Sequence, residues 1–166
     1  LSIRRQRQMC IRDSLSGAAL PLEDSVLVVL GKFNKILEID FENRCVVTQP
    51  GVTNLSITGA VQHEGFYYAP DPSSQMACSI GGNISTNAGG VHTLKYGVTT
   101  NNVLGVEMVL IDGTIIRLGG KNLDAEGYDL LGVVTGSEGL LGVITEITVK
   151  ILKKPQSVRA LSLIHI

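Results

Sequence analysis

Apolar residues occur along this chain in short runs that predict strands more often than helices. Residues 26–30 (VLVVL) form a continuous apolar run, and 35–40 (KILEID) and 45–48 (CVVT) are similar, so all three are expected to be buried or half-buried strands. Glu42 and Asn43 lie between the last two runs and mark a turn. The amino-terminal part of the body is therefore expected to consist of strands.

One helix and one hairpin are expected after these strands. Residues 53–64 (TNLSITGAVQHE) place apolar side chains at helical spacing behind a threonine cap, and the helix should end at Gly65. Two further strands, 102–111 and 114–118, flank Asp112-Gly113, a strong signal for a tight hairpin.

The last predicted strand, 142–152 (GVITEITVKIL), alternates strictly between two kinds of position. We expect the odd-numbered residues 143–151 to face one side and the even-numbered residues 144–152 the other. Because hairpin-paired strands outnumber helices, the pattern favours an α+β fold over an alternating βαβ sheet.

Two glycine-rich segments interrupt this pattern. The first, Pro70 to Gly97, contains the glycine pairs 81–82 and 89–90 among small hydroxyl and amide side chains, and it is expected to build no core. These glycines can take positive φ and let a ligand lie directly on the backbone, as in a polyphosphate or flavin cradle. The second segment, 136–142 (GSEGLLG), leads into the last strand. We expect a second stretch of backbone that a ligand can approach closely at the edge of that strand.

The sequence lacks the motifs of several other nucleotide and metal sites. It contains no GxGxxG between a strand and a helix and no GxxxxGK[ST]. Nothing in the spacing of histidines and cysteines indicates a metal site, and we predict none. Cys45 and Cys78 can form a bridge only if the fold brings them together, so no disulfide framework is indicated.

Both ends of the chain resemble translated laboratory DNA. Residues 4–14 (RRQRQMCIRDS) match a sequencing adapter joined to a transposase mosaic end, and residues 161–166 (LSLIHI) match the reverse complement of that end. We therefore expect 1–14 and 161–166 to be non-native tails and 15–160 to be the body of a truncated domain. Without the tails, 10 basic and 14 acidic residues remain of 14 and 15, a net charge of −4, which gives no reason to expect a nucleic-acid partner.

The order of five motifs carries a resemblance to a known family. PDPSS, CSIGGN, TNAGG, LKYG and GSEGLLGVITEITVKIL follow one another at separations that resemble the FAD-binding domain of FAD-linked 2-hydroxyacid dehydrogenases. This family includes the glycolate oxidase FAD-linked subunit and D-lactate dehydrogenases, within the vanillyl-alcohol oxidase (PCMH) type of flavoproteins. The resemblance covers about 15–155, and LSGAALP at 15–21 resembles the end of a pyrophosphate loop.

The resemblance implies an incomplete α+β FAD-binding domain of two small subdomains, with non-covalent FAD between them. The parent protein would oxidise a 2-hydroxy acid such as glycolate or D-lactate and pass electrons to an external acceptor or partner subunit. Its catalytic base would belong to segments outside this chain, so no catalytic residue is expected here and the fragment should be inactive. We expect a cytoplasmic location, or a peripheral one at the inner membrane. The cofactor-binding residues implied are Gly17, Pro72, Ser73, Ser74, Cys78, Ser79, Gly81, Gly82, Asn83, Thr86, Asn87, Gly89, Gly90, Glu138, Gly139, Gly142, Val143 and Ile144.

Other interpretations of these residues stay open at this point. The domain could belong to a sugar or lactone oxidase, an enolpyruvyl reductase or a non-catalytic flavin-binding subunit, or the glycines could serve turns alone. His92 has no second histidine at ligand spacing and fits a surface or hydrogen-bonded residue as well as a flavin neighbour. Lys95 and Tyr96 could close over the cofactor or form a solvated turn. Cys78 fits a small packed side chain, and Glu138 fits a residue that orders its loop.

Overall fold

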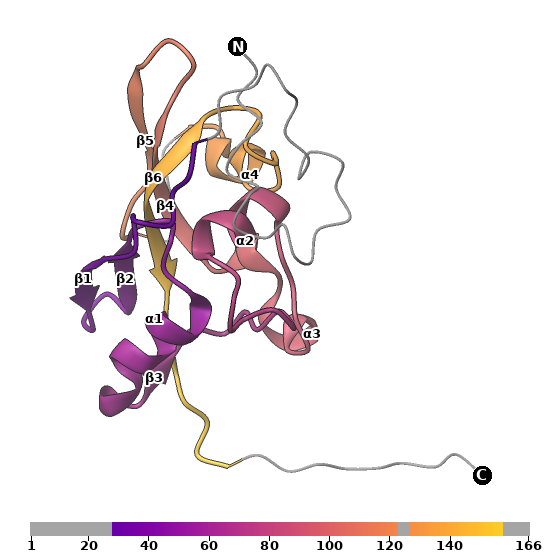
Figure 1. Cartoon of the computed structure of the whole chain (residues 1–166). Coiled ribbons are helices and arrows are strands. Elements are labelled where there is room, and N and C mark those ends of the chain that lie inside the picture. The colour runs from indigo at the N-terminus through magenta and orange to yellow at the C-terminus, as the bar shows by residue number, and fades with distance from the viewer. Residues whose placement is uncertain (1–27, 123–126, 158–166) are drawn as a thin grey trace.

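A five-stranded antiparallel sheet forms one layer of the molecule. The computed structural model describes residues 28–122 and 127–157. The strands lie in the order β1-β2-β6-β4-β5, so β6, from the end of the chain, is central (Figure 1). Their bounds are β1 Ile36–Asp40, β2 Cys45–Thr48, β4 Val103–Val109, β5 Ile115–Gly119 and β6 Val143–Lys150.

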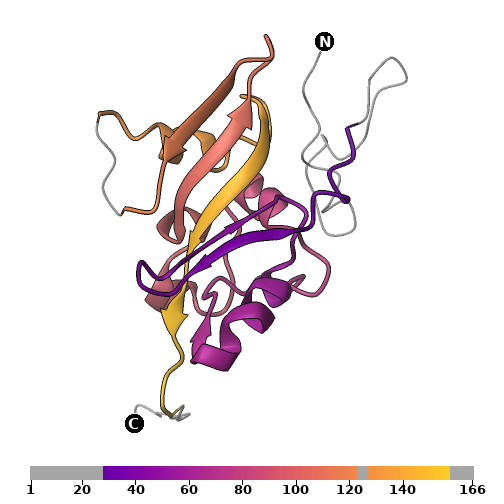
Figure 2. The ribbon, with the colours of Figure 1, turned by 90° about the vertical axis from the view of Figure 1, so that its left-hand side faces the viewer.

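The helices lie together on one face of this sheet, and the described part of the chain leaves the other face open, as the two perpendicular views show (Figures 1 and 2). A small second sheet pairs β3 (Phe66–Tyr67) with β7 (Leu152–Lys153). No helix among the described residues is both long and apolar enough to cross a membrane. The helical elements are α1 Asn54–Val61, η3 Gln62–Glu64, α2 Ile80–Thr86, α3 Thr93–Tyr96, η4 Thr99–Asn101 and α4 Leu130–Val134.

The core lies between the sheet and the helices. Ile147 of β6 and Val46 of β2 are fully buried, as are Ile57 of α1 and Ile84 of α2. This position follows from the pattern of apolar residues, because one face of each strand and one side of each helix must be removed from water.

Several predicted elements are confirmed. Strand β2 has the predicted bounds, and β4 and β5 form the predicted antiparallel hairpin. The hydroxyl of Thr53 accepts a hydrogen bond from Ser56 N at 3.2 Å and caps α1. The helical stretch ends at Gly65, which has a left-handed φ of 75° that glycine adopts without steric cost.

The strand predicted at 26–30 is not confirmed. Residues 26 and 27 lie outside the described part of the chain, and residues 28–30 are not in a strand. Leu30 is buried, and its carbonyl accepts a hydrogen bond from Phe33 N at 2.9 Å. Val28 and Val29 are exposed, because the chain turns here before it enters β1.

The strict alternation predicted for the last strand is wrong at its beginning. Two adjacent residues of β4, Glu107 and Met108, pair with Glu146 and Ile144, so Thr145 is an extra residue in β6. Such a bulge turns all preceding side chains to the opposite face. Ile144, at 2% exposure, therefore lies on the same buried face as Ile147 and Val149, although the prediction placed even- and odd-numbered residues on opposite faces.

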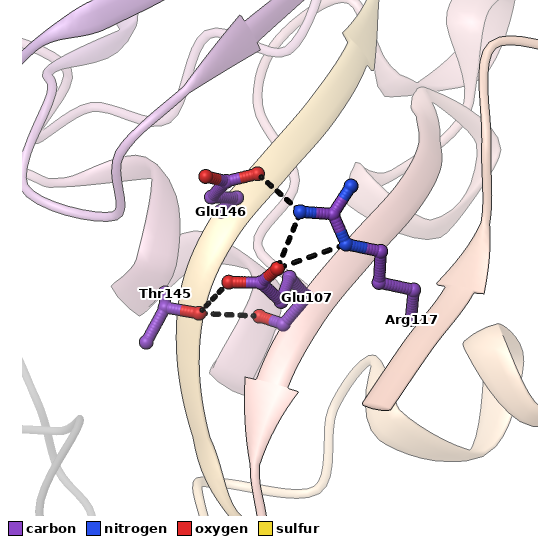
Figure 3. A network of polar contacts seen from close by, with 4 residues as sticks. All are labelled: Glu107, Arg117, Thr145 and Glu146. Carbon is purple, nitrogen blue, oxygen red and sulfur yellow. Dashed lines mark hydrogen bonds and ion pairs between the residues drawn. The ribbon is translucent and has the colours of Figure 1, made fainter. Parts of the chain in front are cut away.

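The bulge allows a polar network to form on the open face of the sheet. Arg117 donates to Glu107 Oε2 from Nε at 2.9 Å and from Nη2 at 2.6 Å, and Thr145 donates to Glu107 Oε1 at 2.9 Å (Figure 3). These bonds, above all the one from Thr145, lower the pKa of Glu107. Arg117 also lies 3.5 Å from Glu146, so it separates two carboxylates that face each other on neighbouring strands.

Candidate functional site

Helix α2 lies in the middle of the first glycine-rich segment. It was expected to build no core, yet Ile80 and Ile84 of α2 are fully buried there. Ser79 is the N-cap, and its hydroxyl accepts a hydrogen bond from Gly82 N at 3.3 Å. The serine cap and the two isoleucines four residues apart are compatible with a short amphipathic helix, which packing against distant residues stabilises in this glycine-rich sequence.

The two glycine pairs do not take the positive φ that was predicted to let a ligand lie on the backbone. Gly81, Gly82, Gly89 and Gly90 all have ordinary φ, and the first two are helical. Gly81 instead allows α2 to pack against the chain at Pro50. A Cβ at Gly81 would lie 2.6 Å from Pro50 Cβ, and Gly81 N donates to Pro50 O at 2.9 Å.

Asn83 belongs to a buried polar network. Its Nδ2 donates to Asn54 Oδ1 at 2.7 Å and lies 3.4 Å from Cys78 Sγ, while Asn54 Nδ2 donates to Pro70 O at 2.9 Å. This network connects α1 to the two ends of the segment that precedes α2. Asn83 and Cys78 therefore hold the loop in position with their side chains.

The carboxyl end of α2 is closed by residues also predicted to bind the cofactor. Thr86 Oγ1 donates to Gly82 O at 3.0 Å, within the helix. Asn87 has a left-handed φ of 48°, a conformation in which asparagine commonly ends a helix. Its Oδ1 accepts a hydrogen bond from Thr100 N at 3.0 Å, which fixes α2 to η4.

The second glycine-rich segment docks on this same end of α2. Gly136 N donates to Ile84 O at 2.8 Å, and Glu138 N donates to Ser85 O at 2.7 Å. Positive φ occurs here, at Gly136 (87°), Glu138 (54°) and Gly139 (74°). The structure therefore brings the two segments together, and loop amides satisfy carbonyls that a helix end leaves without partners.

Gly142, Val143 and Ile144 continue from this loop into β6. A Cβ at Gly142 would lie 2.5 Å from Met108 Cε and 2.7 Å from Val109 O, so glycine permits close contact with β4. Val143 pairs with Val109, and Ile144 pairs with Met108 and is buried. These residues lie beside the loop that includes Glu138 and Gly139, as the sequence order requires.

A surface hollow of about 470 Å³ lies where the PDPSS motif meets the second glycine pair. No hydrogen bond within the described part of the chain uses the N–H groups of Ser73, Gly89 or Val91, all of which line it. A Cβ at Gly90 would collide with the carbonyl oxygen of Asp71, so the two walls meet there without side-chain bulk. The lining residues are Asp71, Pro72, Ser73, Gln75, Gly89, Gly90 and Val91.

Titratable side chains gather beside this hollow. His92 Nδ1 lies 2.6 Å from Asp71 Oδ2, and the Tyr96 ring lies 6.3 Å from the His92 ring and 6.2 Å from that of Tyr67. Hydrogen bonds from Tyr67 and Lys95 lower the pKa of Tyr96, whereas burial raises the pKa of Tyr67. Asp71 was not among the predicted site residues, although its place inside PDPSS, one residue before Pro72, is a signal that points to it.

The predicted cofactor residues fall into three groups in the structure. Those at the hollow are Pro72, Ser73, Gly89 and Gly90, with Ser74 next to Ser73. Those in and before α2 take part mainly in internal packing, and those at 138–144 adjoin the end of α2. Gly17, like the domain boundaries expected at 14 and 160, lies outside the described residues. That these groups contact FAD stays a prediction.

Comparison with known proteins decides the family. The family model described as "FAD binding domain" matches residues 10–119. This chain belongs to that family. It is 56% identical over 147 residues to the glycolate oxidase subunit GlcD of Escherichia coli (strain K12), which covers 89% of this chain and 30% of that protein.

Two other matches agree with this assignment. The chain is 41% identical over 151 residues to the D-lactate dehydrogenase of Anaerostipes hadrus, covering 90% of this chain and 32% of that protein. Among solved structures, alkyldihydroxyacetonephosphate synthase in P1 is similar with a TM-score of 0.74 and 25% identity, over 87% of this chain and 27% of that one. The chain thus spans about a third of its curated relatives' length and has the α+β, PCMH-type FAD-binding fold, in part.

The hollow fits the cofactor of this family. Three N–H groups that have no partner among the described residues provide hydrogen-bond donors for the oxygen atoms of a flavin or its phosphates. Its walls carry small side chains or none at Ser73, Gly89 and Gly90, which leaves the backbone accessible to a planar ring. FAD is accordingly the cofactor of the domain to which this chain belongs.

Proposed function

We propose that this chain provides part of the FAD site of an enzyme that oxidises a 2-hydroxy acid, such as glycolate or D-lactate, to the 2-oxo acid. The observation that carries the proposal is the hollow at Ser73, Gly89 and Val91, whose N–H groups have no partner in the part of the chain that the structure describes. The choice of substrate class is supported by the similarity to GlcD and to a D-lactate dehydrogenase.

FAD, when bound, supplies a two-electron acceptor for this oxidation. The residues of this chain would bind it mainly through the backbone, since the N–H groups at the hollow donate to ligand oxygens while small side chains allow close approach. The buried network of Asn54 and Asn83 would keep the segment before α2 in place whether or not the cofactor is bound. The groups that contact the substrate would come mostly from the rest of the parent protein.

Titration of the chain with FAD tests the location of the site. In Gly90→Ala, the new methyl group would collide with Asp71 and separate the walls of the hollow, so FAD affinity should fall at least about 10-fold. Gly59→Ala is the matched control, because a Cβ there meets nothing within 4 Å. Quenching of FAD fluorescence reports both affinities, and equal affinities for the two variants would place the cofactor elsewhere.

Activity is tested separately, by the reduction of an artificial dye with glycolate or D-lactate as the electron donor. The parent enzyme should reduce the dye with one of them, whereas the 166-residue chain should not and should bind FAD weakly. Strong dye reduction by the chain alone would mean that the catalytic groups lie within it. A parent enzyme that oxidises neither acid would contradict the proposed reaction.

We further propose an external electron acceptor or a partner subunit for the parent enzyme, in keeping with the word "subunit" in the name of GlcD. A cytoplasmic location, or a peripheral one at the inner membrane, is supported by two buried cysteines, Cys45 and Cys78, that remain thiols within the described residues. Cell fractionation with an antibody against the parent enzyme tests this location, and recovery from the periplasm would contradict it.

A further inference from the structure

Asp71 and His92 form a double contact between segments 21 residues apart. His92 Nδ1 lies 2.6 Å from Asp71 Oδ2, and His92 N donates to Asp71 Oδ1 at 3.2 Å. One carboxylate therefore holds both the backbone and the ring of His92. Two bonds to one carboxylate restrict orientation as well as distance, which a single contact does not.

This contact joins the two walls of the hollow. Asp71 lies in one wall, and His92 follows directly on Gly90 and Val91 in the other. Gly90 allows the Asp71 backbone to approach closely at the same place. The spacing of the walls, and with it the position of the N–H groups that line them, therefore depends on this pair.

The contact between Asp71 and His92 contributes little to the stability of the fold. The His92 side chain is 59% exposed, and solvent-exposed polar contacts stabilise folded proteins only weakly. Asp71, at 18% exposure, is nevertheless turned toward its partner and is largely shielded from water. An interaction that adds little stability but fixes the geometry of a ligand-sized hollow is typical of a preorganised binding site.

Aromatic side chains also lie beside His92. The Tyr96 ring lies 6.3 Å from the His92 ring at an interplanar angle of 51°, and Tyr67 of β3 meets Tyr96 edge to face at 6.2 Å. Lys95 Nζ lies 5.1 Å from the centroid of the Tyr96 ring. His92 thus contacts both a carboxylate and an aromatic cluster that includes Tyr67 of the small sheet.

We propose that Asp71 and His92 are positioning residues, a clasp that holds the two walls of the hollow at the spacing that bound FAD requires. The inference rests on the proposed function and deepens it, since it names the residues that set the spacing of the hollow. It follows that breaking the clasp weakens the binding of FAD, and titrations with riboflavin and ADP show which end of FAD depends on the hollow.

The experiment compares four variants of the chain in titrations with FAD, riboflavin and ADP. Asp71→Asn and His92→Gln should each weaken FAD binding about 10-fold, with a parallel loss for riboflavin if the flavin ring occupies the hollow and for ADP if the adenosine end does. His92→Arg supplies a guanidinium that can donate to both oxygens of Asp71 and should restore most of the affinity. His63→Gln is the matched control, since His63 is similarly exposed, at 63%, and lies 4.0 Å from an acidic residue, Glu64.

The outcomes separate the clasp from the proposed function. If Asp71→Asn and His92→Gln bind FAD with the affinity of the wild-type chain, the clasp is overturned and the proposed function still stands. If the wild-type chain takes up no FAD, the proposed function fails. The clasp is then decided by nitrogen-15 NMR, in which Asp71→Asn should shift the His92 ring signals and Glu64→Gln should not, and unchanged His92 signals would overturn it.

Discussion

Replacing Gly81 by alanine tests how α2 is seated on the rest of the domain. Gly81 is buried in the first turn of α2, where its missing side chain allows contact with the chain at Pro50. An alanine Cβ would lie 2.6 Å from Pro50 Cβ, closer than real Cβ atoms approach, and 3.1 Å from Pro50 O, which is tighter than most real contacts. Either α2 or the loop at Pro50 must therefore move, and the hydrogen bond from Gly81 N to Pro50 O must lengthen.

The expected cost follows from three opposing contributions. Alanine is the better helix former by about 1 kcal/mol. Forcing a methyl group into a packed contact costs about 1–3 kcal/mol, and a weakened buried hydrogen bond costs about 1–3 kcal/mol. The net effect is a loss of roughly 1–5 kcal/mol of the free energy of unfolding. In Gly59→Ala, which has the same helix gain and no neighbour within 4 Å, stability should rise by about 0.5–1 kcal/mol.

Urea unfolding of the chain, followed by circular dichroism, compares the two variants under identical conditions. The midpoint should fall for Gly81→Ala and rise for Gly59→Ala, although both are glycine-to-alanine changes in a helix. If Gly81→Ala is as stable as Gly59→Ala, the contact between α2 and Pro50 does not determine the need for glycine at this position. A change in the slope of the transition would instead indicate an altered unfolded or native state.

Two further predictions concern polar side chains. Asn83→Ala should lower the free energy of unfolding by about 1–3 kcal/mol in the same urea assay, because Asn54 Oδ1 loses its buried donor; unchanged stability would mean that water replaces the amide. Hydrogen bonds from the Asn43 side chain and backbone, and a weaker contribution from Lys121, lower the pKa of Asp40 to about 2. Because this folded-state value lies below the unfolded one, the contribution is complete above about pH 4 and is lost as pH falls toward 2. Asp40→Asn should accordingly show a flatter fall of the urea midpoint between pH 4 and pH 2 than wild type, and parallel curves would contradict this account.

Local sequence signals were sufficient for the elements that depend on neighbouring residues. The cap at Thr53, the left-handed end at Gly65 and the turn at Asp112-Gly113 are each determined by the conformational preferences of a few consecutive residues. The two glycine-rich segments could also be recognised in the sequence, because glycines among small polar residues indicate backbone that a ligand or another part of the chain approaches closely. The sequence did not show that some of these close contacts are made by the protein's own chain, as they are at Gly81 and Gly142.

The sequence alone thus determined the α+β class, most strands and the segments that form the candidate site. The tertiary structure decided what those segments do. The bulge at Thr145, the helical conformation of 80–86 and the contact between Asp71 and His92 all depend on residues that are distant in the chain. Periodicity reports which side chains leave water, but pairing register and close backbone contact are set by the partner, and the partner is known only once the chain has folded.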